Sequence, residues 1–166
     1  MKKVTFALFL FLCLSAFNNL SAQDYKTALG IRLSNSNPLV SNSISLKHFL
    51  NEKTAIEGLF SFGDPLSIGG LVEFHKPFST PGLQWYYGAG GYLGFGKDYD
   101  PAKAREVRQT YFGGMGVAGL DFKFANIPLN LSLDWKPELN IVPEINFEPA
   151  AIGFTARFTL GKSTTQ

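Results

Sequence analysis

The stretch LNLSLDWK, residues 129–136, places a large apolar side chain at every second position and a polar one between each pair. Because successive side chains of a β-strand point to opposite faces, this alternation predicts a strand with one apolar and one polar face. The stretch IGFTARFTL, residues 152–160, repeats the pattern, with Arg157 on the face opposite Phe154 and Phe158. Both stretches therefore predict strands that keep charge apart from bulky apolar side chains.

The same alternation recurs in eight segments, which are separated by clusters of Gly, Pro, Asn, Asp or Ser that favour turns. The segments cover residues 25–34, 43–50, 54–62, 66–78, 83–95, 111–124, 129 to about 141, and 151–160. Most are close to the roughly 9–11 residues that a tilted strand needs to cross a bilayer. Pro137 interrupts the seventh segment, so that strand should bulge or end near Lys136. If it ends there, we expect Glu138 to leave the interior.

The charges of these segments lie on the polar face: Lys26, Arg32, Lys47, Glu57, Glu73, Asp121, Lys123, Asp134, Lys136, Glu138 and Arg157. In a membrane barrel this face is the interior, because a Lys or Arg facing lipid near the bilayer centre costs roughly 2–4 kcal/mol. A soluble barrel with apolar residues inside would show the same alternation. The membrane interpretation is favoured because the polar face is rich in glycine, as a narrow interior requires. The apolar face bears Phe74, Trp85, Tyr87 and Trp135, which suit a lipid belt.

Residues 1–22 have the features of a cleaved secretory signal peptide. Lys2 and Lys3 form a basic start, residues 4–17 are mostly apolar, and a short segment ending in Ala22 precedes the expected cleavage. The chain then divides into a signal peptide, 1–22, and one barrel domain, 23–166. The only cysteine, Cys13, falls in the leader, so no disulfide is expected after cleavage. Without Lys2 and Lys3 the formal net charge falls from +2 to 0, which gives no support for a nucleic-acid partner.

Loop lengths add an independent observation, since outer-membrane barrels have short periplasmic turns and longer outer loops. The inner turns would be residues 51–53, 78–82 and 125–128, all of them short. The outer connections would be residues 35–42, 63–65, 96–109 and 142–149, and three of these four are longer.

With these features, the chain resembles the small, porin-like outer-membrane barrel superfamily typified by the transmembrane domain of outer membrane protein A. The likeness is one of architecture over residues 23–166, and WYYGAGGY (85–92) and FTARF (154–158) look like strands of this superfamily. It implies an all-β fold, an eight-stranded antiparallel up-and-down transmembrane β-barrel, in the outer membrane of a Gram-negative cell. It also implies contact with outer-membrane lipid and lipopolysaccharide and insertion by the barrel-assembly machinery. We expect a monomer.

Eight strands leave an interior only wide enough for side chains. We therefore predict that opposite charges pair inside and plug the lumen, so that no open diffusion pore exists. The predicted lumen ion network consists of Arg32, Glu57, Glu73, Asp121, Lys123, Asp134, Lys136 and Arg157.

The longest outer connection, residues 96–109, offers a candidate contact surface. Lys103, Arg105 and Arg108 could bind lipopolysaccharide phosphates or another surface molecule, and a solvated loop without a ligand is the alternative.

The sequence predicts no catalytic residue, cofactor or metal site. The glycines of residues 114–119 match the GxGxxG dinucleotide fingerprint, but residues 120–124 alternate like a strand, where that fingerprint needs a helix. His48 and His75 both fall near the periplasmic ends of their strands, away from the outer rim where a lipid-modifying enzyme would need a Ser–His pair. We therefore expect a structural or surface-interaction barrel that is not an enzyme. A soluble secreted barrel that binds an apolar ligand comes second, and a lipid-modifying outer-membrane enzyme third.

Overall fold

The computed structural model of the chain describes residues 25–35, 39–100 and 105–162. The predicted signal peptide lies outside these residues. Within them, no helix is long and apolar enough to cross a membrane. The described residues form ten strands: β1 (Tyr25–Ser34), β2 (Ser43–Phe49), β3 (Thr54–Ser61), β4 (Leu66–Pro77), β5 (Leu83–Asp100), β6 (Arg105–Lys123), β7 (Leu129–Trp135), β8 (Glu138–Val142), β9 (Asn146–Glu148) and β10 (Ile152–Lys162).

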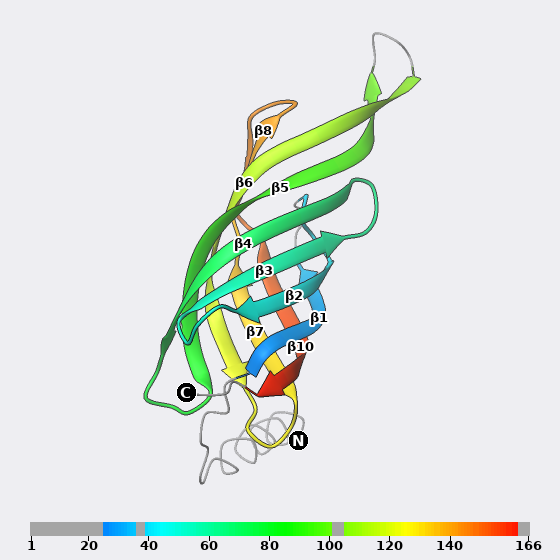
Figure 1. The fold of residues 1–166 in the computed structure, drawn as a ribbon. Coiled ribbons are helices and arrows are strands. Elements are labelled where there is room, and N and C mark those ends of the chain that lie inside the picture. The colour runs from blue at the N-terminus through cyan, green and yellow to red at the C-terminus, as the bar shows by residue number, and fades with distance from the viewer. Residues whose placement is uncertain (1–24, 36–38, 101–104, 163–166) are drawn as a thin grey trace, which may run out of the picture.

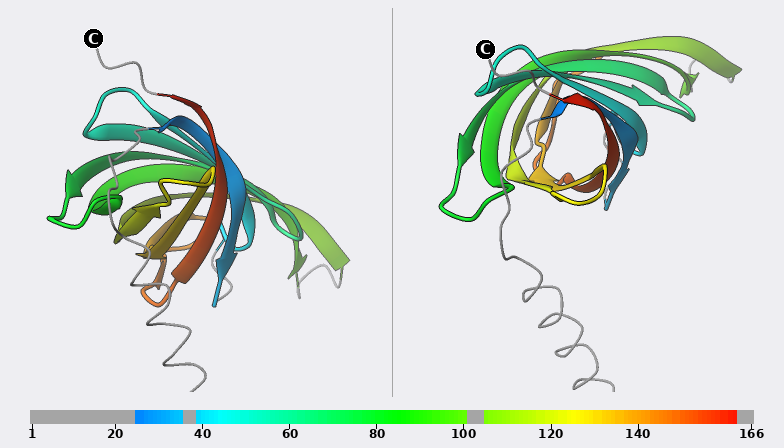
Figure 2. Two further views of the ribbon diagram at one scale, coloured as in Figure 1. Left: turned by 90° about the horizontal axis from the view of Figure 1, so that it is seen from below. Right: turned by 60° about the horizontal axis from the view of Figure 1, so that its bottom comes forward.

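Eight of these strands close into an antiparallel barrel (Figures 1 and 2). Each strand from β1 to β6 pairs with the next one along the chain. The ring is completed by β10, which pairs with β7 on one side and with β1 on the other. The all-β, eight-stranded up-and-down fold that the alternation predicts is therefore confirmed.

The prediction of an irregular outer loop at residues 96–109 is wrong. β5 and β6 continue their pairing beyond the barrel, from Leu83↔Phe122 to Asp100↔Arg105. On its other side β5 pairs with β4, whose first residue, Leu66, lies opposite Phe95. Beyond Phe95, β5 has only β6 as a partner, so the last part of the β5–β6 hairpin is a two-stranded ribbon. Figure 1 shows this ribbon rising past the ends of the other strands.

Pro137 does break the seventh strand, as its missing N–H predicts. β7 ends at Trp135, and β8 resumes at Glu138 along the upper part of β6 and forms a hairpin with β9. The expectation that Glu138 would then leave the interior is wrong, because its side chain is only 2% exposed. The chain keeps its direction through the proline, with the Gly116 N–H donating to the Pro137 carbonyl at 3.0 Å, so Lys136 and Glu138 still point to the same side.

The outer wall of the barrel is apolar and its inner wall is polar. One row of mutually paired positions around the outside runs Ile31, Ile44, Phe60, Ile68, Leu93 and Phe112, and each of these side chains is exposed. Leu133, Trp135, Phe154 and Phe158 are 53%, 50%, 48% and 66% exposed, whereas Asp134 and Arg157 are 4% and 1% exposed. This is the arrangement that a membrane barrel requires.

The first residues of β1 depart from the predicted parity. Tyr25 was predicted on the outer face, but it is buried and packs its ring edge-on against Phe49, with 5.2 Å between the ring centroids. Lys26, predicted to point inward, is exposed. At the mouth of the barrel the long Tyr25 side chain can reach the interior, and the flexible Lys26 remains in contact with solvent.

Candidate functional site: the polar interior of the barrel

Among the described residues, nine charged side chains lie inside the barrel, each no more than 4% exposed. They come from eight of the ten strands and from the break after β7: Arg32, Lys47, Glu57, Glu73, Asp121, Asp134, Lys136, Glu138 and Arg157. Because an unpaired buried charge is strongly destabilising, their partners decide what the interior can do.

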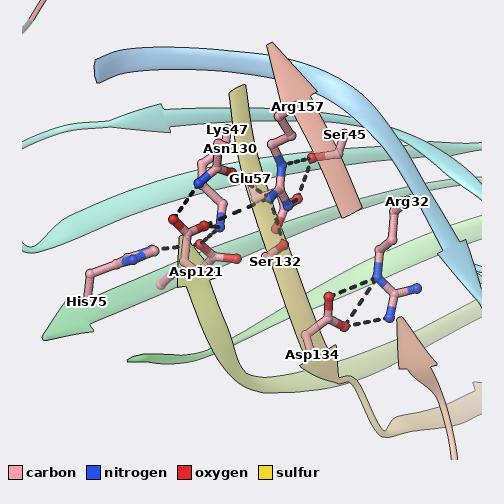
Figure 3. A network of polar contacts seen from close by, with 11 residues as sticks. Arg32, Ser45, Lys47, Glu57, His75, Asp121, Asn130, Ser132, Asp134 and Arg157 are labelled. Atoms are coloured by element: carbon pink, nitrogen blue, oxygen red, sulfur yellow. Dashed lines mark hydrogen bonds and ion pairs between the residues drawn. The ribbon is translucent and has the colours of Figure 1, made fainter. Parts of the chain in front are cut away.

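Arg157 of β10 is the centre of the largest cluster (Figure 3). Its Nε donates to Ser45 Oγ at 2.6 Å, and its Nη1 donates to Ser132 Oγ at 2.9 Å and to Asn130 Oδ1 at 3.3 Å. Its Nη2 forms an ion pair with Glu57, which also accepts a 2.5 Å hydrogen bond from Ser45. One guanidinium therefore ties β10 to β2, β3 and β7 across the lumen.

Lys47 of β2 extends this cluster toward the end of the barrel that carries the β2–β3 turn. Its Nζ lies 2.8 Å from Glu73 Oε2 and 3.6 Å from Asp121 Oδ2, and it sits 4.3 Å from the centroid of the Tyr86 ring. Asp121 also accepts a 2.5 Å hydrogen bond from the Asn130 amide. The sequence placed Lys47 on the polar face, yet the predicted network did not include it.

His75, near the end of β4, lies at the edge of the same cluster. Its Nε2 lies 3.0 Å from Glu73 Oε2, and its ring stacks on Tyr86 with 5.0 Å between centroids and 10° between planes. Phe49 packs on the histidine ring at 4.8 Å. The histidine thus belongs to the interior polar cluster.

Arg32 and Asp134 form a second, separate ion pair. Arg32 Nη2 lies 2.6 Å from Asp134 Oδ1, and Arg32 Nε donates to the same oxygen at 3.2 Å. Figure 3 shows this pair standing apart from the side chains around Arg157.

A third ion pair, Lys136–Glu138, holds a turn of the chain inside the barrel. Lys136 Nζ donates to the carbonyl oxygen of Val40 at 3.0 Å, and the Val40 N–H donates to Glu138 Oε2 at 3.4 Å. Ser67 Oγ donates to the neighbouring Leu39 carbonyl at 2.5 Å. The connection between β1 and β2, expected to be an outer loop, therefore sends Val40 inward.

Val40 completes an apolar layer in the interior. It is fully buried and packs in one cluster with inward side chains of four strands, namely Leu59, Leu71, Tyr86, Tyr92, Met115 and Val117. Sequence reasoning missed both this layer and the turn that fills it. The available signal was the apolar pair Leu39 and Val40 within a connection that otherwise consists of Asn, Ser and Pro.

The structure brings seven of the eight predicted network residues into the interior. The exception is Lys123, the last residue of β6, whose Nζ donates to the backbone carbonyls of Phe124 and Ile127. Parity placed it correctly on the polar face, but its position at the strand end leaves it too near the rim to reach the other charges.

The candidate contact residues lie on the β5–β6 ribbon. Arg105 and Arg108 are exposed residues of β6, and Lys103 lies outside the described residues. Arg108 is paired in register with Lys97, which forms an exposed ion pair with Glu106 at 3.5 Å. Exposed pairs of this kind contribute at most about 1 kcal/mol, so the ribbon presents a weak mixture of charges.

The remaining motifs are structural in this fold. Residues 114–119 lie within β6 and no helix follows them, so the glycine pattern does not form a dinucleotide site. An added Cβ on Gly119 would come within 2.6 Å of the Leu133 carbonyl oxygen, which fits close strand packing. His48 bonds Thr27 at 2.8 Å near the outer wall. Among the described residues, no group of three or more His, Cys, Asp or Glu side chains could hold a metal ion.

Comparison with solved structures supports the fold. The chain is similar to the crystal structure of the N-terminal β-barrel domain of Pseudomonas aeruginosa OprF, with a TM-score of 0.56 and 14% sequence identity. The match covers 81% of this chain and 96% of that domain. No protein-family model and no curated protein matches the sequence. The chain thus has the eight-stranded barrel fold of outer-membrane type, as the resemblance stated above implies.

Proposed function

We propose that this chain is an integral outer-membrane barrel with a structural or surface-interaction role and with a lumen closed by its own side chains. The observation that carries this proposal is the inverted wall, apolar outside and ionic inside. Soluble monomers seldom expose continuous apolar patches larger than a few hundred Å², whereas a bilayer requires such a belt. Export through the predicted leader, residues 1–22, is part of the proposal.

Aromatic side chains near the periplasmic strand ends support the membrane location. Trp85 and Tyr87 stack on the outer wall at 5.5 Å, and Phe74 lies 5.7 Å from Tyr87. Lys76 places its Nζ 5.1 Å from the Trp85 ring. Amphipathic rings and a cation at one level of the wall suit the boundary between acyl chains and headgroups.

The contents of the lumen support a closed barrel. The hydrogen bonds and the ion pair of Arg157 cross the interior. A separate part of the interior is occupied by the apolar layer around Val40. A soluble carrier would need an apolar cavity, but one part of this interior is charged and the apolar part is occupied by Val40.

Fractionation and gel mobility test the membrane location. The full chain, expressed with its leader, should sediment with the outer membrane and require detergent for extraction. The unheated folded barrel should migrate differently from the boiled chain. Recovery in the soluble periplasmic fraction would contradict the proposal and favour the secreted carrier.

Planar-bilayer recording tests the closed lumen. Purified, folded protein should produce no stable large conductance, because the interior side chains leave no continuous aqueous path. A steady large current from the wild-type barrel would refute the plugged lumen while leaving the membrane location intact.

The surface-interaction role is assigned to the ribbon of β5 and β6. Arg105 and Arg108, with Lys103 at the hairpin tip in the sequence, are the residues we propose to contact lipopolysaccharide phosphates. Alanine substitution of all three should weaken co-purification of lipopolysaccharide with the barrel without changing its gel mobility. Unchanged co-purification would remove this role from the ribbon.

A further inference from the structure

The interior charges do not balance. Two ion pairs are one-to-one, Arg32 with Asp134 and Lys136 with Glu138. The remaining cluster contains two cations and three carboxyl groups, Lys47 and Arg157 against Glu57, Glu73 and Asp121. If all five were ionised, the buried cluster would carry one excess negative charge.

An excess charge in this position is physically costly. All five side chains are at most 4% exposed, so water cannot solvate the additional carboxylate. Removing a charge from water without a partner costs several kcal/mol, and a buried acid commonly avoids that cost by binding a proton. The charge count therefore requires the cluster to hold one more proton than its separate groups would hold at neutral pH.

The geometry locates that proton. Glu57 and Glu73 are both buried in the interior on neighbouring strands, two positions apart across the β3–β4 register, and such diagonal neighbours are close enough for long side chains to meet. Two ionised carboxylates are acceptors only, so a hydrogen bond between them needs a proton on one. We propose that Glu57 and Glu73 form a buried proton-binding site that shares one proton, carried by Glu73.

The surrounding contacts favour Glu73 as the carrier. Glu57 accepts from the Arg157 guanidinium and from Ser45, both of which stabilise its ionised form. Glu73 Oε2 faces Lys47 and His75, while Glu73 Oε1 has no other hydrogen-bond donor. A proton on Oε1, donated to the Glu57 carboxylate, satisfies both groups and leaves the cluster neutral.

Each neighbouring element contributes groups that bear on this proton. They are Tyr25 of β1, Lys47 of β2, His75 of β4 itself, Tyr86 of β5, Asp121 of β6, Asp134 of β7 and Arg157 of β10. His75 is the competing carrier, because an imidazolium would balance the same charge. It would, however, leave the two carboxylates ionised and facing each other.

The consequence is a barrel that loses stability as the pH rises. A glutamate in the unfolded chain releases its proton in mildly acidic solution, whereas the folded barrel keeps the proton on Glu73 to a higher pH. Unfolding therefore releases a proton, and stability falls from the mildly acidic range upward until Glu73 itself is deprotonated. Above that pH one excess negative charge remains in the interior and stability stays at its lower level.

Substitution of Glu73 by glutamine tests the site, since an amide mimics the protonated acid. In lipid vesicles, Glu73→Gln should have a urea midpoint at neutral pH equal to or above that of the wild type. It should also lack the fall in stability that the wild type shows as the pH rises. If His75 carries the proton instead, Glu73 is ionised and pairs with both Lys47 and His75, so the same change removes a needed anion and lowers the midpoint, which would overturn the proposal.

The matched control is Glu138→Gln, which removes the anion of a one-to-one buried pair. It should lower the midpoint at neutral pH, showing that the assay detects loss of a needed carboxylate. Glu57→Gln should do the same, because Arg157 then loses its ion-pair partner.

A spectroscopic measurement on the wild-type barrel keeps the test independent of variant folding. The infrared spectrum in heavy water at neutral pH should contain a carbonyl stretch from a protonated carboxyl group, and this band should be absent from Glu73→Gln. Absence of the band in the wild type, with a cationic His75 ring by nuclear magnetic resonance, would place the proton on the histidine and overturn the assignment. The inference rests on the proposed closed lumen, but conductance recordings test that closure separately.

Discussion

At the scale of single residues, the close approach of neighbouring strands depends on particular glycines. Gly90 of β5 is exposed, yet an added Cβ there would come within 1.8 Å of the Gly70 carbonyl oxygen of β4. Gly70 itself is exposed on the outer wall, and a Cβ there would meet nothing within 4 Å. The two positions are neighbours across the β4–β5 pair but differ completely in the space available.

Alanine substitution should separate these two glycines. Gly90→Ala forces the backbone of β4 and β5 apart and should destabilise the barrel by about 1–3 kcal/mol, as overpacking does elsewhere. Gly70→Ala should stay within about 0.5 kcal/mol of wild type. Urea midpoints in vesicles measure both, and equal effects at the two positions would refute the packing argument.

Except for Lys26, residue parity predicted which face each strand charge occupies, but it did not predict which charges meet. The alternation placed Lys47 and Lys123 on the same face as Asp121, yet only Lys47 reaches that carboxylate. Two charged side chains can meet only if they lie at the same height along the barrel axis. That height depends on strand register and tilt, which a local sequence pattern does not contain. For the same reason no local pattern indicated that Glu57 and Glu73 would face each other.

At the scale of elements, the turn that carries Val40 packs into the interior of the barrel and fills part of it. Its backbone is held by Lys136 and Glu138, which flank the proline that ends β7. The break in the seventh strand and the insertion of the first outer connection are therefore two parts of one arrangement.

Cysteine labelling tests this arrangement, since Cys13 lies in the predicted leader and the rest of the chain has no thiol. Val40→Cys should react slowly with a bulky maleimide in the folded barrel. Adding Lys136→Met removes the donor to the Val40 carbonyl and leaves Glu138 unpaired, so the reaction should become much faster. Glu144→Cys, at an exposed site, serves as the reactive control. A rate for Val40→Cys that does not respond to Lys136→Met would show that the ion pair does not hold the turn.

Sequence predicted most strand boundaries to within a few residues, because period-two alternation is strong wherever one face lines the polar interior and the other forms the apolar outer wall. It failed at residues 96–109, where β5 and β6 continue as a ribbon. There both faces are polar, so alternation disappears although pairing persists. It also failed at Val40, where a turn is fixed by the distant residues Lys136 and Glu138, on either side of Pro137, rather than by its own neighbours.

At the scale of the whole molecule, the inverted wall makes a quantitative prediction about lipid. Leu133 lies on the outer face of β7, beside Phe154 and Leu120 in register, within the apolar belt. Leu133→Arg should cost roughly 2–4 kcal/mol if it faces the middle of a bilayer. Ile145→Arg, in the exposed turn between β8 and β9, should be nearly neutral. Folding titrations in vesicles measure both, and a neutral Leu133→Arg would place that face in water.

The seam between β1 and β10 also determines how the molecule is completed. Every other strand in the ring pairs with one that is near it in sequence, but this pair joins Thr27 to Leu160. Until β10 arrives, β1 and β7 each present a row of unsatisfied peptide groups, which is a template for joining another chain. Pairing of β10 with β1 and β7 is thus the step that closes the ring and removes its unpaired strand edges. Until that step, we expect the chain to need a chaperone that covers these edges.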